Sequence, residues 1–399
     1  MSVLSYLEKL LNGVDIQWKT IGEVTLRTSN IKWREATRSY RYVDLTSVDI
    51  ETKKITETTE VTANNAPSRA QKLIEENDVI FATTRPTQQR FCLIDGEYSD
   101  EVASTGFCVL RAKQDEVLPK WIWHWISTSY FKKYVEENQS GSAYPAISDA
   151  KVKECYIPVP CPENPEKSLT IQAEIVRILD KFTALTAELT AELNMRKKQY
   201  NYYRDQLLSF EEGEVEWKTL GDLGENLDSK RKPITSGLRE AGSIPYYGAS
   251  GIVDYVKDYI FDGDFLLISE DGANLLARNT PIAFSISGKS WVNNHAHVIK
   301  FDSYAERRYV EYYLNSIDLS PYISGAAQPK LNKKNLESIR IPNPSPEDKE
   351  RIVSILDKFD ALTNSINEGL PREIELRQKQ YEHYRDLLFS FPKPEAASN

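Results

Sequence analysis

Apolar residues recur at alternating spacings of three and four along residues 171–207. The positions are Ile171, Ile175, Ile178, Phe182, Leu185, Leu189, Leu193, Tyr200, Tyr203 and Leu207, with only Arg196 out of pattern. This alternation is the seam of a coiled coil, so it predicts a long amphipathic helix with a helical partner. At 1.5 Å per residue the helix would be about 55 Å long.

A second stretch with the same spacing lies near the C-terminus. Its positions are Ile352, Ile355, Phe359, Leu362, Ile366, Ile374, Arg377, Tyr381, Tyr384 and Leu388. Gly369-Leu370-Pro371 interrupts it, and proline cannot continue a helix without a kink. Two such helices most simply pair with each other, so we expect an antiparallel pair that acts as a spacer between two globular bodies. Two separate amphipathic core helices are the alternative.

The two stretches belong to a long internal repeat. Ile-Leu-Asp-Lys-Phe occupies residues 178–182 and again 355–359, and Lys-Gln-Tyr occupies 198–200 and 379–381. The period of roughly 180 residues is too long for a solenoid and indicates two copies of one module. Further shared strings are Trp-Lys-Thr at 18–20 and 217–219, Ser-Gly at 140–141 and 324–325, and Ile-Pro at 157–158 and 341–342.

Between the shared strings the two bodies, residues 23–139 and 222–323, show almost no similarity. A shared frame with divergent inserts suggests one scaffold that carries two recognition surfaces. Duplication followed by drift is the alternative, although drift should blur frame and insert alike. Thr-Ala-Glu-Leu also occurs twice in succession, at 186–189 and 190–193. Each unit is about one helical turn, or about 6 Å, which corresponds to about two base pairs of DNA.

Composition fits a soluble protein of two or three domains. Of 399 residues, 40% are hydrophobic and 27% are charged, as in globular proteins. No apolar run approaches the length of a membrane span, and the N-terminal stretch around Glu8 and Lys9 lacks the apolar core of a signal peptide. The four cysteines form no CxxC pair, which predicts reduced thiols in a cytoplasmic protein.

The net charge of −9 is unusual for a protein that binds nucleic acid, but the charge is unevenly distributed. Residues 30–41 hold four cations against Glu35, and residues 227–239 hold four against Asp228. Both basic segments follow the Trp-Lys-Thr string. This pattern favours a subunit that shares DNA binding with larger, more basic partners.

No catalytic motif is complete. Gly288-Lys289-Ser290 lacks the leading glycine of a phosphate-binding loop, because Ala283 stands there. Asn343-Pro344-Ser345-Pro346 shares only two letters with an adenine methyltransferase motif and follows no glycine-rich loop. His295 and His297 have neither a third histidine nor a cysteine pair nearby, so we expect no metal site. A nuclease motif is too short to exclude from sequence. We expect a binding subunit without a catalytic site.

Candidate DNA-binding residues are side chains with the donors and acceptors that read base edges or phosphates. In the first body they are Lys32, Arg34, Arg38, Arg69, Arg85, Gln88, Gln89, Arg90, Ser142 and Tyr144. In the second they are Lys230, Arg231, Lys232, Tyr247, Ser250, Asp271, Asn274, Asn293, Asn294, Gln328 and Lys330. Taken singly, each is better explained as a solvated loop residue, and only as a set do they favour DNA binding. The two Ser-Gly segments run from Ser140 to Ile147 and from Ser324 to Leu331. Their candidates, Ser142, Tyr144, Gln328 and Lys330, are better suited to phosphate contacts or to closing the fold than to reading sequence.

With these strings, the chain resembles the specificity subunits of type I restriction-modification systems. The resemblance covers essentially the whole chain and is strongest in 171–210 and 352–391. The Thr-Ala-Glu-Leu pair with Arg-Lys-Lys-Gln-Tyr at 196–200 resembles the type IC branch, where the number of tetrapeptides is linked to the length of an unread DNA gap. The resemblance implies two target recognition domains that each read one half of a split double-stranded DNA sequence. It also implies two modification (methyltransferase) subunits and restriction subunits, an ATP-dependent translocase and nuclease, as partners.

The resemblance further implies that S-adenosylmethionine, ATP and Mg serve the partner subunits and that this chain holds no cofactor. The expected fold class is mixed α/β. Its expected parts are recognition domain 1 (1–160), spacer helix 1 (168–210), recognition domain 2 (215–345), spacer helix 2 (347–391) and a disordered tail (392–399). The exposed helix faces and the segments around Trp18 and Trp217 are the expected docking surfaces. A single-chain nuclease or methyltransferase, or a coiled-coil adaptor that does not touch DNA, are the alternatives.

Overall fold

The computed structural model describes residues 11, 13–211, 213–325, 328–365 and 367–392. The predicted tail beyond Pro392 and the first ten residues lie outside this description. The chain divides into two compact units. Unit 1 comprises the chain up to Thr190 together with the segment from Glu373 onward, and unit 2 comprises Ala191–Arg372. Among the described residues, none of the helices is long and apolar enough to cross a membrane.

The repeated strings of the frame pair with each other inside each unit. In unit 1, β1 (Ile16–Thr20) runs antiparallel to β10 (Tyr156–Pro160), which sets Trp18 opposite Pro158. In unit 2, β11 (Glu216–Thr219) pairs with β18 (Arg340–Asn343) in the same way, with Trp217 opposite Pro342. Each Trp-Lys-Thr string and its Ile-Pro string therefore form a ribbon that closes a module.

Among the described residues, unit 1 holds two four-stranded sheets and three α-helices in addition to the helices of the heptad stretches. The first sheet has the order β2 (Thr25–Leu26), β9 (Phe107–Ala112), β6 (Val79–Ala82), β7 (Phe91–Leu93). The second has the order β4 (Thr59–Val61), β3 (Tyr40–Val43), β8 (Glu101–Ser104), β5 (Ala70–Ile74). The helices are α2 (Pro119–Ile126), α3 (Ser129–Asn138) and α4 (Asp149–Glu154). The core contains Trp121 and Trp125 of α2, both almost fully buried.

Among the described residues, unit 2 holds one six-stranded sheet and four short or medium α-helices in addition to the helices of the heptad stretches. The strand order is β12 (Glu225–Asn226), β17 (Ala296–Lys300), β15 (Phe261–Ser269), β16 (Ala283–Val292), β13 (Ala241–Gly248), β14 (Gly251–Val256). The helices are α6 (Leu220–Leu223), α7 (Asn274–Ala277), α8 (Tyr304–Ser316) and α9 (Lys333–Glu337). The mixed α/β class is thereby confirmed in both units.

The first heptad stretch is one helix, α5 (Pro165–Leu208), of 44 residues. The second stretch is not the single helix that we expected over 347–391. It forms α10 (Pro346–Thr363) and α11 (Gly369–Leu388). The break falls where the sequence predicted an interruption. At Gly369, the first residue of α11, φ is +75° and a Cβ would lie 2.3 Å from the carbonyl oxygen of Ala361. Pro371 sits in the first turn of α11, where a missing N–H costs little.

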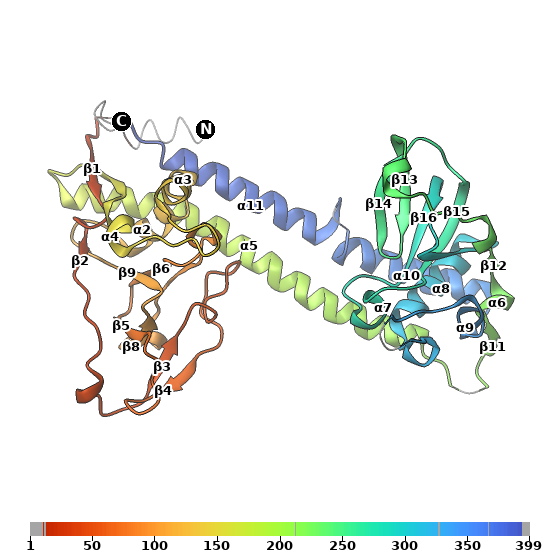
Figure 1. Cartoon of the computed structure of the whole chain (residues 1–399). Helices are drawn as coiled ribbons and strands as arrows, with labels where there is room; N and C mark the ends of the chain where they lie inside the picture. The colour runs from red at the N-terminus through yellow and green to blue at the C-terminus, as the bar shows by residue number, and fades with distance from the viewer. Residues whose placement is uncertain (1–10, 12, 212, 326–327, 366, 393–399) are drawn as a thin grey trace. The chain divides into compact units, whose positions relative to one another are not determined.

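The heptad seam has two uses in each unit. Its middle pairs with the other helical segment, antiparallel to α5 (Figure 1). Phe182 stacks on Tyr384 of α11 in unit 1 and Tyr203 stacks on Phe359 of α10 in unit 2, with ring centroids 5.3 and 5.7 Å apart. The ends of the seam contribute instead to the cores of the units: Ile171 and Ile175 to unit 1, and Leu207, beside the buried Leu208, to unit 2. Within each unit, the helical pair is therefore continuous with that unit's own core.

In each unit, one buried core residue comes from the helical segment that follows the other module in the sequence. In unit 1, Phe389 lies 4.6 Å from Trp121 between ring centroids and is buried. In unit 2, Leu208 is the corresponding buried residue. We expect Phe389→Ala to lower the unfolding free energy of unit 1 by about 3–5 kcal/mol and Leu208→Ala that of unit 2 by about 2–5 kcal/mol.

Urea unfolding followed by tryptophan fluorescence and by circular dichroism measures both effects. The exposed Glu382→Ala on α11 is the matched control, with an expected change within about 0.5 kcal/mol. If Phe389→Ala unfolded like the control, the segment after α11 would not belong to the core of unit 1.

A repeated aspartate ties each helix pair to its module. In unit 1, Asp180 of α5 accepts from Lys120 Nζ at 2.5 Å and from His124 Nε2 at 3.0 Å, both on α2. In unit 2, the equivalent Asp357 of α10 accepts from Arg308 at 3.0 Å and from the Tyr312 hydroxyl at 2.6 Å, both on α8. One carboxylate thus holds the same place in both copies while its partners differ.

His124 makes the unit 1 contact sensitive to acid. It is fully buried, and its Nδ1 accepts from the Tyr381 hydroxyl of α11 at 3.0 Å. Burial lowers the pKa of His124 despite the opposing effect of Asp180. The unfolded chain, with an ordinary histidine pKa of about 6.5, therefore binds the proton more tightly. We expect the stability of unit 1 to be full above that pH and to fall as pH drops below it.

Unfolding free energies across that pH range test this expectation. His124→Gln should flatten the slope for unit 1, whereas His383→Gln, on the exposed face of α11, should leave the slope unchanged. An unfolding free energy of unit 1 that rises on acidification would contradict the expected sign.

Candidate nucleic-acid interface

The polar loops predicted for recognition occupy equivalent places in the two units. The first follows β6, and the second follows β15. Each is held to the Ser-Gly segment of its own module by a backbone hydrogen bond, from Ile147 N–H to Thr83 O at 2.9 Å and from Leu331 N–H to Glu270 O at 2.8 Å. Isolated bridges repeat the match, between Thr84 and Ala146 and between Asp271 and Lys330. The loop and the Ser-Gly segment therefore form one surface in each unit.

In unit 1 this surface carries an exposed cation beside an exposed aromatic ring. Arg85 has a left-handed backbone with φ 48°, and its N–H donates to Pro145 O at 2.7 Å. Its guanidinium carbon lies 5.5 Å from the ring centroid of Tyr144, which is 72% exposed. Gln88 is exposed in the same loop, in the 3-10 turn η2 (Pro86–Gln88). Ser142, in the Ser-Gly segment, is also exposed.

Two predicted arginines of unit 1 form hydrogen bonds or ion pairs within the protein. Arg90 donates to the carbonyl oxygens of Leu45 and Val48. Arg38 donates to Asp100 O at 2.5 Å and forms an ion pair with Glu101 at 3.3 Å. We therefore assign both a role in holding the loops. Gln89 is half-buried, with its Oε1 in the interior.

Three other cations of unit 1 come together through a tryptophan. Trp33 Nε1 donates to Ala70 O at 2.8 Å, and Ile31 N–H donates to Gln71 O at 2.8 Å. These bonds bring the turn η1 (Trp33–Glu35) beside β5. The exposed side chains that this contact gathers are Lys32, Arg34 and Arg69.

Sequence reasoning missed one cation of unit 1. Lys53 Nζ donates to Gln89 O and lies 4.4 Å from the ring centroid of Phe91. Burial lowers the pKa of Lys53 to about 8. The two residues are 36 positions apart in the sequence, so no local sequence pattern predicts their contact.

In unit 2 the structure brings four predicted segments together. The turn between β13 and β14 is fixed by Ser269, whose hydroxyl donates to Ala249 O at 2.5 Å. Asn293 N–H donates to Tyr247 O at 3.1 Å, and Asp271 pairs with His295 at 2.9 Å. Exposed candidates on these segments are Ser250, Asn294, Gln328, Lys330, Lys230 and Lys232. Asn274 instead forms paired hydrogen bonds with the backbone of Thr280 at 3.0 Å and so closes its own loop.

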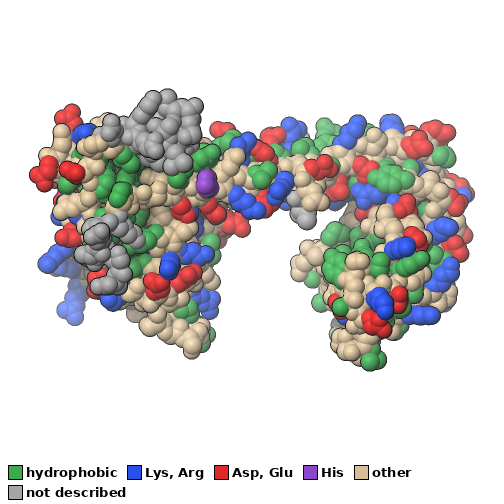
Figure 2. Space-filling model, turned by 90° about the horizontal axis from the view of Figure 1, so that it is seen from above, with side chains coloured by type: hydrophobic (Ala, Val, Ile, Leu, Met, Phe, Trp, Pro, Cys, Tyr) green, Lys and Arg blue, Asp and Glu red, His purple; other side chains and the backbone are tan. Residues whose placement is uncertain are grey.

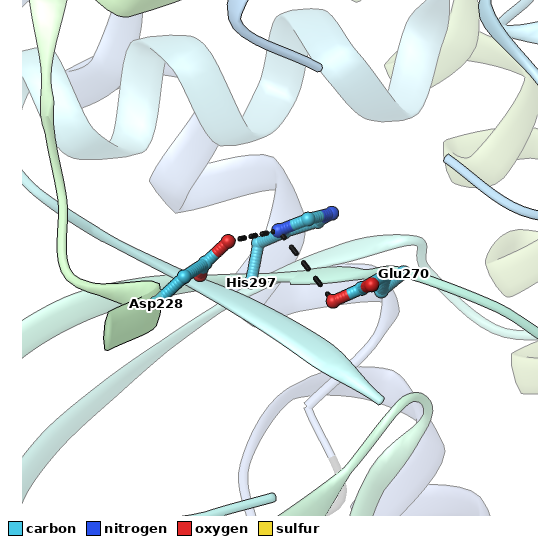
Figure 3. Close-up of side chains that lie close together, drawn as sticks. All are labelled: Asp228, Glu270 and His297. Atoms are coloured by element: carbon cyan, nitrogen blue, oxygen red, sulfur yellow. Dashed lines mark hydrogen bonds and ion pairs between the residues drawn. The ribbon is translucent and has the colours of Figure 1, made fainter. Parts of the chain in front are cut away.

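Beneath this surface lies a buried charged cluster, Asp228, Glu270 and His297 (Figure 3). Their ligand atoms lie within 4.8 Å of one another, as in a metal site. Cationic side chains of the protein form ion pairs with Glu270: Arg231 lies 2.6 Å and Lys330 3.0 Å from its carboxylate. Burial raises the pKa of both carboxyls, but the hydrogen bonds and cations outweigh it and leave each pKa below its ordinary value. The cluster does not have the vacant ligand atoms that a metal needs.

Each module thus presents a different polar surface on the same closed frame, which defines a duplicated binding protein. The sequence profile of the type I restriction modification DNA specificity domain matches residues 15–196 and 212–376. The chain belongs to this family.

Relatives within the family match the chain from end to end. It is 41% identical to the specificity subunit of the type I restriction enzyme EcoR124I/EcoR124II of Escherichia coli, over the full length of both. It is 36% identical to the EcoprrI specificity subunit of the same species, over 92% of this chain and 93% of that protein.

Two solved structures share the fold. One belongs to work on complex assembly and conformational transition of the type I R-M system, with a TM-score of 0.61 and 22% identity over 94% of this chain and 97% of that chain. The other is the S subunit of a type I system from M. genitalium, with a TM-score of 0.58 and 15% identity over 96% of this chain and 98% of that one. At these identities the likeness supports the fold alone.

Proposed function

We propose that this chain is the specificity subunit of a type I restriction-modification complex and recognises a bipartite DNA sequence, one half with each unit. The observation that carries the proposal is the equivalent placement of the two polar loops, one after β6 and one after β15. Both abut a Ser-Gly segment on the same closed frame, yet their side chains differ. Equivalent positions with different side chains are what two readers of two different half-sites require.

Within unit 1, Arg85 and Gln88 are the best candidates to read base edges in the major groove, because both are exposed on the same loop. Arginine and glutamine can each make paired hydrogen bonds to a base. The cations Lys32, Arg34 and Arg69 suit phosphate contacts, which set register and add affinity without reading sequence. Within unit 2, Asn294, Ser250, Gln328 and Lys330 occupy the corresponding surface.

Catalysis belongs to partners in this proposal. Two modification subunits would bring S-adenosylmethionine, and restriction subunits would bring ATP and Mg. The exposed helix faces are the proposed docking surfaces, since acidic and basic side chains are mixed along them (Figure 2) and pair in i,i+4 steps such as Glu375–Lys379 at 2.5 Å. Trp18 and Trp217 are half-buried against the cores of their own units, so their first role is closure. We expect the complex to act in the cytoplasm.

Replacement of Arg85 tests the proposal. We expect Arg85→Ala, in complex with the modification subunits, to lose about 1–3 kcal/mol of discrimination in one half-site. Discrimination in the other half-site should be unchanged. Competition binding against duplexes with either half scrambled measures both. Lys167→Ala, an exposed cation on α5 of the same unit, is the matched control. Equal losses at both half-sites, or no preference for the target over random duplex in the unaltered complex, would contradict the proposal.

A further inference from the structure

The ring of His297 is enclosed by hydrogen-bond acceptors on both sides. Nδ1 lies 2.6 Å from a carboxylate oxygen of Asp228, and Nε2 lies 2.7 Å from the carbonyl oxygen of Leu331. The side chain is almost fully buried, so water does not replace either partner. A neutral imidazole has one N–H and can satisfy only one acceptor, whereas the imidazolium cation donates from both nitrogens. The geometry requires the cation.

The charges around the ring fit a cation there. Asp228, in the 3-10 turn η4 (Asp228–Lys230), and Glu270, after β15, both face Nδ1, the latter at 3.8 Å. Arg231, directly after η4, and Lys330 of the Ser-Gly segment face the same Glu270 carboxylate, and Arg231 also lies 3.3 Å from Asp228. The imidazolium adds a third cation beside these two carboxylates, and of the other two cations Lys330 is half exposed.

The cluster ties together the segments that carry the predicted recognition residues of unit 2. Asp228 joins the basic segment to β17, since its second oxygen accepts from Val298 N–H at 3.0 Å. Arg231 donates to Ala296 O at 2.8 Å as well as to Glu270. Through Leu331 O, the histidine fixes the end of the Ser-Gly segment. Loss of one bond at the ring would therefore loosen several loops together.

Unit 1 has no charge at the equivalent position. His297 lies opposite Ile268 in the β15–β17 pair, and Cys108 lies opposite Phe81 in the matching β6–β9 pair. Burial raises the pKa of the Cys108 thiol to about 12, so this residue stays neutral. The same backbone site is thus apolar in one unit and ionic in the other.

We propose that His297 is a positioning residue whose buried imidazolium holds the recognition loops of unit 2, so that reading of the second half-site alone depends on its proton. This proposal rests on the proposed DNA function. Without that proton, one of the two acceptors has no donor and the loops are released. The half-site read by unit 1 keeps its discrimination.

The test is competition binding of the complex with its modification subunits from about pH 6 to about pH 9, a range that spans histidine titration. The competitors are the target duplex and duplexes with either half-site scrambled. Discrimination at the second half-site should fall about ten-fold with rising pH, while discrimination at the first stays constant. His297→Gln should be low and flat at the second half-site, and His383→Gln should follow the unaltered chain.

Asp228→Asn gives the sharpest contrast. An asparagine amide donates to Nδ1 of a neutral ring while Nε2–H still donates to Leu331, so both ring nitrogens are satisfied without the extra proton. We expect Asp228→Asn to retain discrimination at the second half-site and to lose its pH dependence. A pH response that survives in Asp228→Asn would overturn the proposal.

Nitrogen-15 shifts of the histidine rings in the full chain provide a readout that is independent of DNA. Both nitrogens of His297 should carry protons in the folded chain. A neutral tautomer would refute the imidazolium, whereas a complex without half-site preference would refute the proposed function and leave this readout intact.

Discussion

A third Thr-Ala-Glu-Leu unit inserted after Leu193 should lengthen the unread gap of the DNA target by about two base pairs and leave both half-sites unchanged. Four more helical residues extend α5 by about 6 Å, and base pairs rise about 3.4 Å each. The existing units form regular helix, in which the hydroxyls of Thr186 and Thr190 donate to the carbonyls one turn back at 3.0 and 2.8 Å.

The insertion point favours this outcome because it lies close to the boundary between the units at Thr190 and Ala191. The added turn therefore disturbs neither core. Selection from randomised duplexes by the complex, followed by sequencing, measures the gap. Four Gly and Ser residues at the same point are the control, with an expected loss of a defined gap; an altered half-site after the Thr-Ala-Glu-Leu insertion would contradict the account.

Exchange of residues 23–139 for the corresponding body of another family member should change one half-site completely and leave the other half-site and the gap unchanged. The reason is that the ribbon and the helical segments of the frame lie outside this body, which meets them through α2 residues such as Trp121 and His124. The ribbon of β1 and β10, with α5 and the segment around Phe389, forms the remaining wall of the core.

The same selection experiment reads the outcome of the exchange. Exchange of residues 222–323 is the reciprocal control, and it should change the opposite half-site. A chimera that changed both half-sites, or neither, would show that the bodies do not read independently.

The sequence predicted those parts of the fold that are written in local patterns. Heptad spacing located α5, and Gly369-Leu370-Pro371 located the break that separates α10 from α11. It did not show that the ends of the seam are core residues, because Ile175 and Leu207 look the same in a coiled-coil seam and in a domain core. Nor could it pair β1 with β10, since ribbon pairing is a contact between distant strands.

The candidate site was predictable in its loops and less so in its chemistry. The loop around Arg85 and the turn at Tyr247 could be predicted, because each is a polar segment between two hydrophobic segments. That Arg90 and Arg231 bind backbone and carboxylate partners was not visible, because those partners come from other parts of the chain. The cluster at His297 joins three separate segments for the same reason. Residue type identified the candidates. Tertiary contacts then distinguished the residues that are free to contact DNA from those that hold the loops in place.

The central claim is that two independent readers share one duplicated frame. The most direct test is to map methylated adenines across the genome of a host that expresses the complete system. The account predicts one motif made of two short specified halves with a fixed unread gap between them. A single contiguous motif, or methylation without sequence preference, would contradict it.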